Sequence, residues 1–236
     1  MRQDYTHITF VLDRSGSMNS IWNDVQGSFN QFVKDQNSQP GYATFSLYIF
    51  DDFHDRLADF VDLTTFAGLP LNVKPRGSTA LLDAIGRSII ETGNRLSIIS
   101  LLDRPSKVVF VVQTDGYENA SREFTFAKIS EIIRHQTDNY NWQFVFLGAN
   151  IDAIASASQV GINPANSVNY AASSIGTKSV YDVLSGKISS YRVGGCSGMA
   201  FTPEEKREVE QHVDQTNVPD PFNPNPLNPD NFVVNP

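Results

Sequence analysis

Short runs of apolar residues alternate along the chain with stretches in which apolar residues recur every three or four positions. The apolar runs are rich in Val, Ile and Phe and read HITFVL (7–12), ATFSLYIF (43–50), KVVFVVQ (107–113) and WQFVFLG (142–148). Near-continuous apolar character is typical of strands that are buried on both faces, as in a parallel sheet. We therefore expect these four runs to be the parallel strands at the centre of the fold.

Helical periodicity fills the intervals between these strands. It covers residues 21–36, 80–102, 126–137 and 152–160, where apolar residues line one face. Strands and helices in alternation predict right-handed crossovers and a doubly wound α/β fold. A turn at Asp51 and Asp52, followed by another extended run, predicts a hairpin. The sheet is thus expected to be mostly parallel with one antiparallel edge strand.

The pattern continues to residue 192, and we expect one α/β domain over residues 1–192. Residues 166–173 fit a short last strand, and residues 178–192 fit a last core helix. Residues 193–217 then combine a Gly-rich linker with a surface helix that begins at Thr202 in a capping box.

The last segment, residues 218–236, carries six prolines, which exclude a helix or a central strand. Its composition fits a disordered tail or an extended Pro/Asn-rich arm of polyproline type. Its apolar residues favour an arm that packs on its own domain or on a neighbouring molecule: Phe222, Leu227, Phe232, Val233 and Val234.

Charge and composition narrow the classes of partner. The 236 residues include 26 acidic and 18 basic ones, for a net charge of −8, and no cluster of Lys and Arg, which argues against nucleic acid. Cys196 is the single cysteine, so neither an internal disulfide nor a thiolate metal site is available. The N-terminus has no signal pattern and no apolar run is long enough to span a membrane, so we expect a cytoplasmic protein, or one carried in a particle assembled in a cytoplasm.

Three polar loops follow predicted strands or open a predicted helix, and they offer only oxygen atoms as ligands. Asp13, Ser15 and Ser17 follow the first strand, Thr79 opens the helix that begins TALLDAIG, and Asp115 follows the KVVFVVQ strand. The carboxyl ends of parallel strands share one edge of a sheet, so these loops are expected to converge. Two carboxylates and three hydroxyls, without imidazole or thiolate, suit a hard cation such as Mg²⁺.

In order and context, these five residues resemble the metal-ion-dependent adhesion site of von Willebrand factor A domains. The α/β rhythm from residue 5 to about 192 is similar to that family as well, and FVFLGANIDAIA resembles its stand-alone bacterial and bacteriophage members. The resemblance implies direct Mg²⁺ ligation by Ser15 and Ser17, and ligation by Thr79 directly or through water. Asp13 and Asp115 would act largely through bridging waters, and Mn²⁺ or Ca²⁺ are the alternative cations. It further implies an open coordination position for an Asp or Glu carboxylate of a partner protein.

Rival functions are weaker on the same residues. A phosphatase that uses Asp13 as nucleophile needs a second acid two residues on, where Ser15 stands. The four histidines are scattered and pair with no evident nucleophile, so we expect no enzyme: His7, His54, His135 and His212. Thr79 alone fits an ordinary helix N-cap. Glu118 fits a place in the shell of residues around the metal ligands or a solvated loop acid, and we expect the latter.

The favoured function is a Mg²⁺-dependent protein-binding module. The alternative is a structural or assembly protein, for instance of a bacteriophage particle, in which the domain is a scaffold and the C-terminal arm is the interface. The protein-binding and assembly functions would be combined in self-association, in which Asp220, Asp230 or the terminal carboxylate fills the open metal position of a neighbouring copy.

Overall fold

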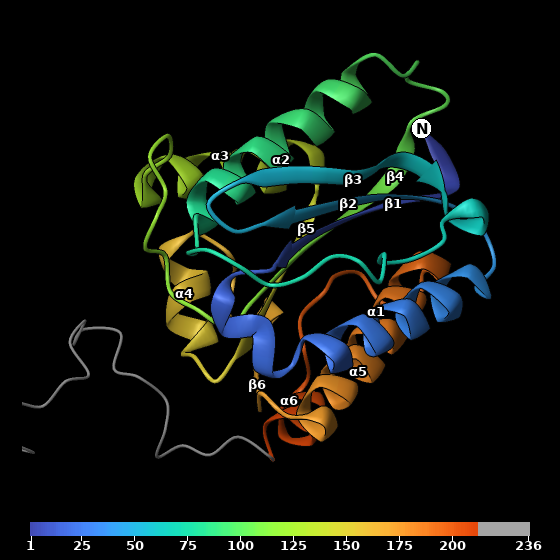
Figure 1. Cartoon of the computed structure of the whole chain (residues 1–236). Helices are drawn as coiled ribbons and strands as arrows, with labels where there is room; N and C mark the ends of the chain where they lie inside the picture. The colour runs from blue at the N-terminus through green and yellow to red at the C-terminus, as the bar shows by residue number, and fades with distance from the viewer. Residues whose placement is uncertain (212–236) are drawn as a thin grey trace, which may run out of the picture.

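The computed structural model describes residues 1–211, which form a six-stranded sheet between two layers of helices (Figure 1). The strand order is β3-β2-β1-β4-β5-β6, and every neighbouring pair is parallel except β2 and β3. The predicted doubly wound α/β fold with one antiparallel edge strand is therefore confirmed. The strands are β1 (Arg2–Asp13), β2 (Tyr42–Phe50), β3 (His54–Asp62), β4 (Pro105–Thr114), β5 (Gln143–Ala149) and β6 (Ser167–Tyr170).

Helices cover both faces of the sheet. One layer holds α1, α5 and α6, and the other holds α2, α3 and α4 (Figure 1). Their bounds are α1 (Trp22–Asn37), α2 (Leu81–Ser97), α3 (Phe126–Tyr140), α4 (Ala153–Gln159), α5 (Ser174–Val193) and α6 (Pro203–Glu210). Short 3₁₀ turns lie at η1 (Gly16–Ser20), η2 (Leu63–Thr65) and η3 (Pro164–Asn166).

The central strands are mostly apolar because each contributes to two cores. Phe10 of β1 packs in the layer of α1 and α5, where its ring meets those of Phe29, Phe32 and Tyr181 at centroid distances of 5.2, 6.0 and 6.1 Å. The next residue, Val11, lies in the core under α2 and α3. Successive side chains of a strand point to opposite faces, so a strand covered on both sides is apolar at most positions. The buried polar residues His7 and Thr9 of β1 are hydrogen-bonded.

Two helix bounds differ from the sequence prediction by four or more residues. Helix α2 ends at Ser97 instead of residue 102, because the Arg104 guanidinium donates hydrogen bonds to the carbonyls of Ser97 and Ile99 and so closes the helix end. Helix α5 begins four residues earlier than expected, where the Ser173 hydroxyl accepts a hydrogen bond from the Gly176 amide.

Residues beyond 192 pack on the same core. Helix α6 begins with the predicted capping box, in which Thr202 and Glu205 each bind the other's backbone amide with a side-chain oxygen. Met199, Phe201 and Val209 are buried in the core that α1 and α5 share. The division of the chain at residue 192 stays a prediction.

Residues 212–236 lie outside the described part of the chain, and with them His212, the end of the predicted linker and the whole predicted arm. Within residues 1–211, no helix has the length and apolar character needed to cross a membrane.

Candidate metal centre

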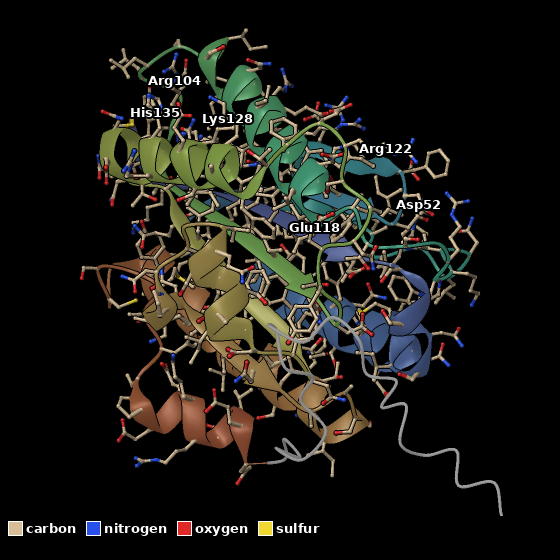
Figure 2. All side chains as sticks on the ribbon, turned by 90° about the vertical axis from the view of Figure 1, so that its left-hand side faces the viewer. Asp52, Arg104, Glu118, Arg122, Lys128 and His135 are labelled. Carbon is tan, nitrogen blue, oxygen red and sulfur yellow. The ribbon has the colours of Figure 1, made fainter. Side chains whose placement is uncertain are left out.

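The predicted site residues lie at the carboxyl ends of β1 and β4, two adjacent parallel strands at the centre of the sheet. Asp13 is the last residue of β1, and Asp115 directly follows β4. The chain leaves β1 toward α1 and β2, and β4 lies on the other side of β1, so the strand order reverses at this point. Open α/β sheets form their ligand sites at such a reversal. Figure 2 views the molecule from this side, with Asp52 and Glu118 labelled on neighbouring loops.

Asp13 ties the first loop to β4. Its carboxylate is fully buried, with Oδ1 accepting a hydrogen bond from the Ser15 amide at 2.6 Å and Oδ2 accepting one from the Thr114 hydroxyl at 2.5 Å. The chain then turns into η1, whose Met18 side chain is buried. Asp13 therefore sets the position of the serine loop relative to the strand that carries Asp115.

The two serines of the loop turn toward each other and toward Asp115. Ser15 Oγ lies 3.1 Å from Ser17 Oγ, and the Ser17 hydroxyl donates a hydrogen bond to Asp115 Oδ1 at 2.6 Å. Ser15 is buried, whereas Ser17 is exposed. The structure thus brings Asp13, Ser15, Ser17 and Asp115 into one hydrogen-bonded cluster that is open to solvent on the side of Ser17.

Thr79 reaches the same cluster from the segment before α2. Its amide donates to the Asn119 side chain at 2.8 Å, and its carbonyl accepts from the Asn119 amide at 3.1 Å. A Cβ atom placed on Gly116 would lie 3.2 Å from Thr79 Oγ1 and 3.7 Å from Ser17 Oγ, so both hydroxyls border the space that Gly116 leaves free. Thr79 does not cap α2: the N-cap is Ala80, without a side-chain cap.

The expectation that Glu118 is a solvated loop acid is wrong. Glu118 is half-buried, and its carboxylate accepts hydrogen bonds from the amides of Leu82, Ala120 and Ser121 at 2.9, 2.9 and 2.6 Å. It therefore binds the loop after β4 to the first turn of α2, where free amides favour an anion.

Asp83, which sequence reasoning did not select, holds the same loop from α2. Its carboxylate accepts hydrogen bonds from the amides of Arg122, Glu123 and Phe124 at 2.9 to 3.0 Å. The sequence does show an acidic residue in the first turn of a predicted helix, which could have drawn attention to Asp83. The amides that it binds, however, lie some forty residues further along the chain. The loop that carries Asp115 is thus fixed to the helix that Thr79 precedes.

The carboxylates of the cluster carry raised pKa values. Burial raises the pKa of Asp13 to about 7, although hydrogen bonds from Thr114 and Ser15 oppose the shift, and the charge of Asp115 adds to it. Burial also raises the pKa of Asp115, against the hydrogen bond from Ser17. The protein itself therefore does not fully offset the negative charges of Asp13 and Asp115, and a proton or a cation would stabilise these two carboxylates.

The arrangement fits a small hard cation. All five side chains offer oxygen, and the 3.1 Å between Ser15 Oγ and Ser17 Oγ is close to the roughly 3 Å that separates adjacent ligands of an octahedron with bonds of about 2.1 Å. Across residues 1–211 no three or more His, Cys, Asp or Glu side chains form a cluster able to hold a metal ion. A cation at this place would therefore depend on the hydroxyl groups.

No protein-family model and no curated protein matches the sequence, whereas solved structures do match. The pilus adhesin SpaC of Lactobacillus rhamnosus GG in its open conformation gives a TM-score of 0.62 at 11% identity, over 79% of this chain and 30% of that one. The proximal thread matrix protein 1 of the mussel byssus gives 0.57 at 17% identity, over 84% of this chain and 48% of that one. The present chain thus spans about half the length of the mussel protein.

A third match is a single domain of comparable size. The vWF domain of the type V pili tip protein Mfa5 from Porphyromonas gingivalis gives a TM-score of 0.57 at 12% identity, over 83% of this chain and 98% of that one. Identities this low establish the fold alone. The structural matches, the sheet order and the helix layers together show that the chain has the α/β fold of von Willebrand factor A domains.

Proposed function

We propose that this protein is a divalent-cation-dependent protein-binding module, with Mg²⁺ as the resident cation and Mn²⁺ or Ca²⁺ as substitutes. The hydroxyls of Ser15, Ser17 and Thr79 would hold the cation, and Asp13 and Asp115 would hold it largely through water. The observation that carries the proposal is the hydrogen-bonded cluster of Asp13, Ser15, Ser17 and Asp115 at the strand reversal.

The chemistry of the cluster favours an anionic partner. A cation bound mainly by neutral hydroxyls keeps net positive charge and attracts a carboxylate. Ser17 is exposed while Ser15 and Asp13 are buried, so the open side of the cluster faces solvent, where an Asp or Glu of another protein has access. Adhesion is a function named for SpaC, which has a similar fold, and it is in keeping with this proposal.

Catalysis is not part of the proposal. The cluster contains no imidazole or thiol to act as a general base or nucleophile. A Ser–His hydrogen bond does exist elsewhere, between Ser88 Oγ and His54 Nε2 at 2.9 Å, but Ser88 is fully buried in α2. A substrate has no access to that hydroxyl.

Metal binding and carboxylate binding are tested separately on the full chain. Titration of Mg²⁺ should raise the melting temperature of the wild type, since a ligand at one hundred times its Kd stabilises by about 2.7 kcal/mol, and EDTA should reverse the effect. Asp13→Ala and Asp115→Ala should lose the response. Amide NMR shifts on adding acetate should appear around Ser17 and Gly116 only when Mg²⁺ is present. Acetate shifts that are equal in EDTA would refute the proposal.

The assembly function remains the second candidate, on the strength of the apolar residues within 218–236. Light scattering of the full chain and of a chain lacking 218–236, each with Mg²⁺ and with EDTA, separates the two. An oligomer that requires the arm and Mg²⁺ would support self-association through the metal centre. An unchanged assembly would remove that link.

A further inference from the structure

A basic hollow lies beside the candidate metal centre, although the chain as a whole has a net charge of −8. The hollow measures about 490 Å³ and lies between the β2–β3 hairpin and the segment that leads to α2. Four cationic side chains and one carboxylate line it: Arg14, Arg56, Lys74, Arg76 and Asp55. The buried Asp51 also contacts Arg14 and Arg76, so among these six side chains four cations face two carboxylates.

A buried carboxylate fixes the wall of the hollow. Asp51 is fully buried, and its Oδ2 lies 3.1 Å from Arg14 Nε and 2.6 Å from Arg76 Nε. Its Oδ1 accepts a hydrogen bond from the Phe53 amide at 2.7 Å. Arg14 also reaches Asp55 with Nη2 at 2.5 Å. The guanidinium groups are therefore held in place before any ligand arrives, which lowers the entropy cost of binding.

The hollow adjoins the metal centre through the backbone. Arg14 lies between Asp13 and Ser15 in the sequence, and its carbonyl accepts a hydrogen bond from the Arg76 amide at 2.8 Å. The following residue, Gly77, accepts one from the Gly16 amide at 3.1 Å. The segment that lines the hollow is therefore bound directly to the serine loop.

Two of the cations retain charge for a ligand. Arg14 is paired with Asp51 and Asp55, and Arg56 is paired with Glu91. Lys74 is exposed and forms no ion pair within residues 1–211. Arg76 uses Nε on Asp51, and its side chain is 58% exposed.

An exposed aromatic ring stands at the rim of the hollow. The Arg76 guanidinium lies 5.6 Å from the centre of the Phe53 ring, and Phe53 is 64% exposed. Aromatic residues, Phe among them, and Arg are enriched at protein–protein interfaces. The rim thus offers apolar contact next to the two available cations.

We propose that this hollow binds a second acidic side chain of the same partner segment whose first carboxylate completes the metal centre. The partner is then a protein segment with two Asp or Glu residues at a defined spacing, one for the cation and one for Lys74 and Arg76. This inference rests on the proposed function. The hollow gives that function selectivity, because a single carboxylate is common on protein surfaces and a correctly spaced pair is not.

Synthetic peptides test the inference by amide NMR titration of the full chain in Mg²⁺. Acetyl-GDGGGG-amide presents one carboxylate, and four further peptides place a second Asp one to four residues after the first. We expect one spacing to bind about three- to tenfold more tightly than the single acid, the size of one or two partly screened ion pairs, and to shift the amides of residues 72–76. The gain should shrink in 0.5 M NaCl, where the Debye length is only a few ångströms.

Variants assign the gain to the hollow. Lys74→Gln should remove part of it and Lys74→Glu all of it, with affinity for the single-acid peptide unchanged. Within residues 1–211, Lys74 forms no ion pair whose loss could destabilise the protein. Lys128→Gln, on α3, is the matched control and should leave the gain intact. Equal affinity at every spacing, or a gain that Lys74→Glu leaves in place, would overturn the inference. Failure of the single-acid peptide to bind in Mg²⁺ would instead reject the proposed function. Whether or not that peptide binds, diacid peptides that leave residues 72–76 unshifted would reject the hollow as a binding site.

Discussion

Replacing Asp13 by Asn should stabilise the metal-free protein and at the same time abolish its response to Mg²⁺. The Asp13 carboxylate is fully buried and burial raises its pKa to about 7, whereas in the unfolded chain its pKa is near 3.8. At pH 8 both states are ionised, and the folded state carries a cost of up to about 4 kcal/mol for this charge. Asn keeps an oxygen for the Ser15 amide and removes the charge, so we expect a gain of about 1 to 4 kcal/mol.

The pH dependence of this gain has a definite sign. A carboxyl whose pKa is raised on folding binds more protons in the folded state between pH 3.8 and 7, so the contribution of Asp13 to the stability of the metal-free wild type falls as pH rises through that window. The advantage of Asp13→Asn should therefore be largest at pH 8 and nearly absent at pH 4. Mg²⁺ should reverse the order at pH 8, since only the wild type gains stability from it.

Urea denaturation followed by tryptophan fluorescence measures these differences, because Trp22 and Trp142 are both buried. The four conditions are pH 8 and pH 4, each with EDTA and with 10 mM Mg²⁺. Asp138→Asn, at an exposed position of α3, is the control and should change stability by less than about 0.5 kcal/mol. A variant no more stable than the wild type in EDTA at pH 8, or one that Mg²⁺ stabilises fully, would refute the electrostatic account of the site.

Three further results are expected. Gly116→Ala places a Cβ 3.2 Å from Thr79 Oγ1 and should weaken Mg²⁺ binding about tenfold in calorimetry, whereas Gly93→Ala, with open space around it, should leave binding unchanged. Burial lowers the pKa of His7 to about 3, so the contribution of His7 to stability should fall by up to about 1.4 kcal/mol per pH unit from pH 6.5 toward 3, opposite in sign to that of Asp13. His7→Gln should remove this contribution, which the difference between variant and wild type in urea titrations measures. Glu118→Gln should cost about 1 to 3 kcal/mol of unfolding free energy, against at most about 1 kcal/mol for the exposed Glu123→Gln; equal losses would deny Glu118 its anchoring role.

The sequence predicted two kinds of element: strands that helices cover on both faces, and turns or caps that depend on residues close together in the chain. The runs that became β1, β2, β4 and β5 are apolar because helices cover both faces, and Asp51 with Asp52 marked the hairpin that makes β3 antiparallel. The capping box at Thr202 involves residues three apart and was likewise readable. The order of the polar loops also predicted that the candidate residues lie together at the carboxyl ends of the central strands, as the structure has them.

The differences arise where distant residues decide the local structure. Ile98, Leu101 and Leu102 extend an apolar pattern and yet are exposed, since Arg104 ends α2 before them. Glu118 binds the Leu82 amide across 36 positions, and Asp51 holds Arg76 across 25. No spacing rule connects such pairs, so the anchoring carboxylates and the basic hollow emerge only from the folded arrangement.

The length and the neighbours of β1 have a mechanical consequence. This twelve-residue strand carries the amino terminus at one end and Asp13 at the other, about 35 to 40 Å apart at roughly 3.3 Å per residue. It is flanked on both sides by parallel strands, β2 and β4. A pulling force between an N-terminal tether and a partner held at the metal centre would run along β1 and load both sets of strand hydrogen bonds in shear. Such bonds must break together instead of one after another, so β1 would resist a force applied between these two points.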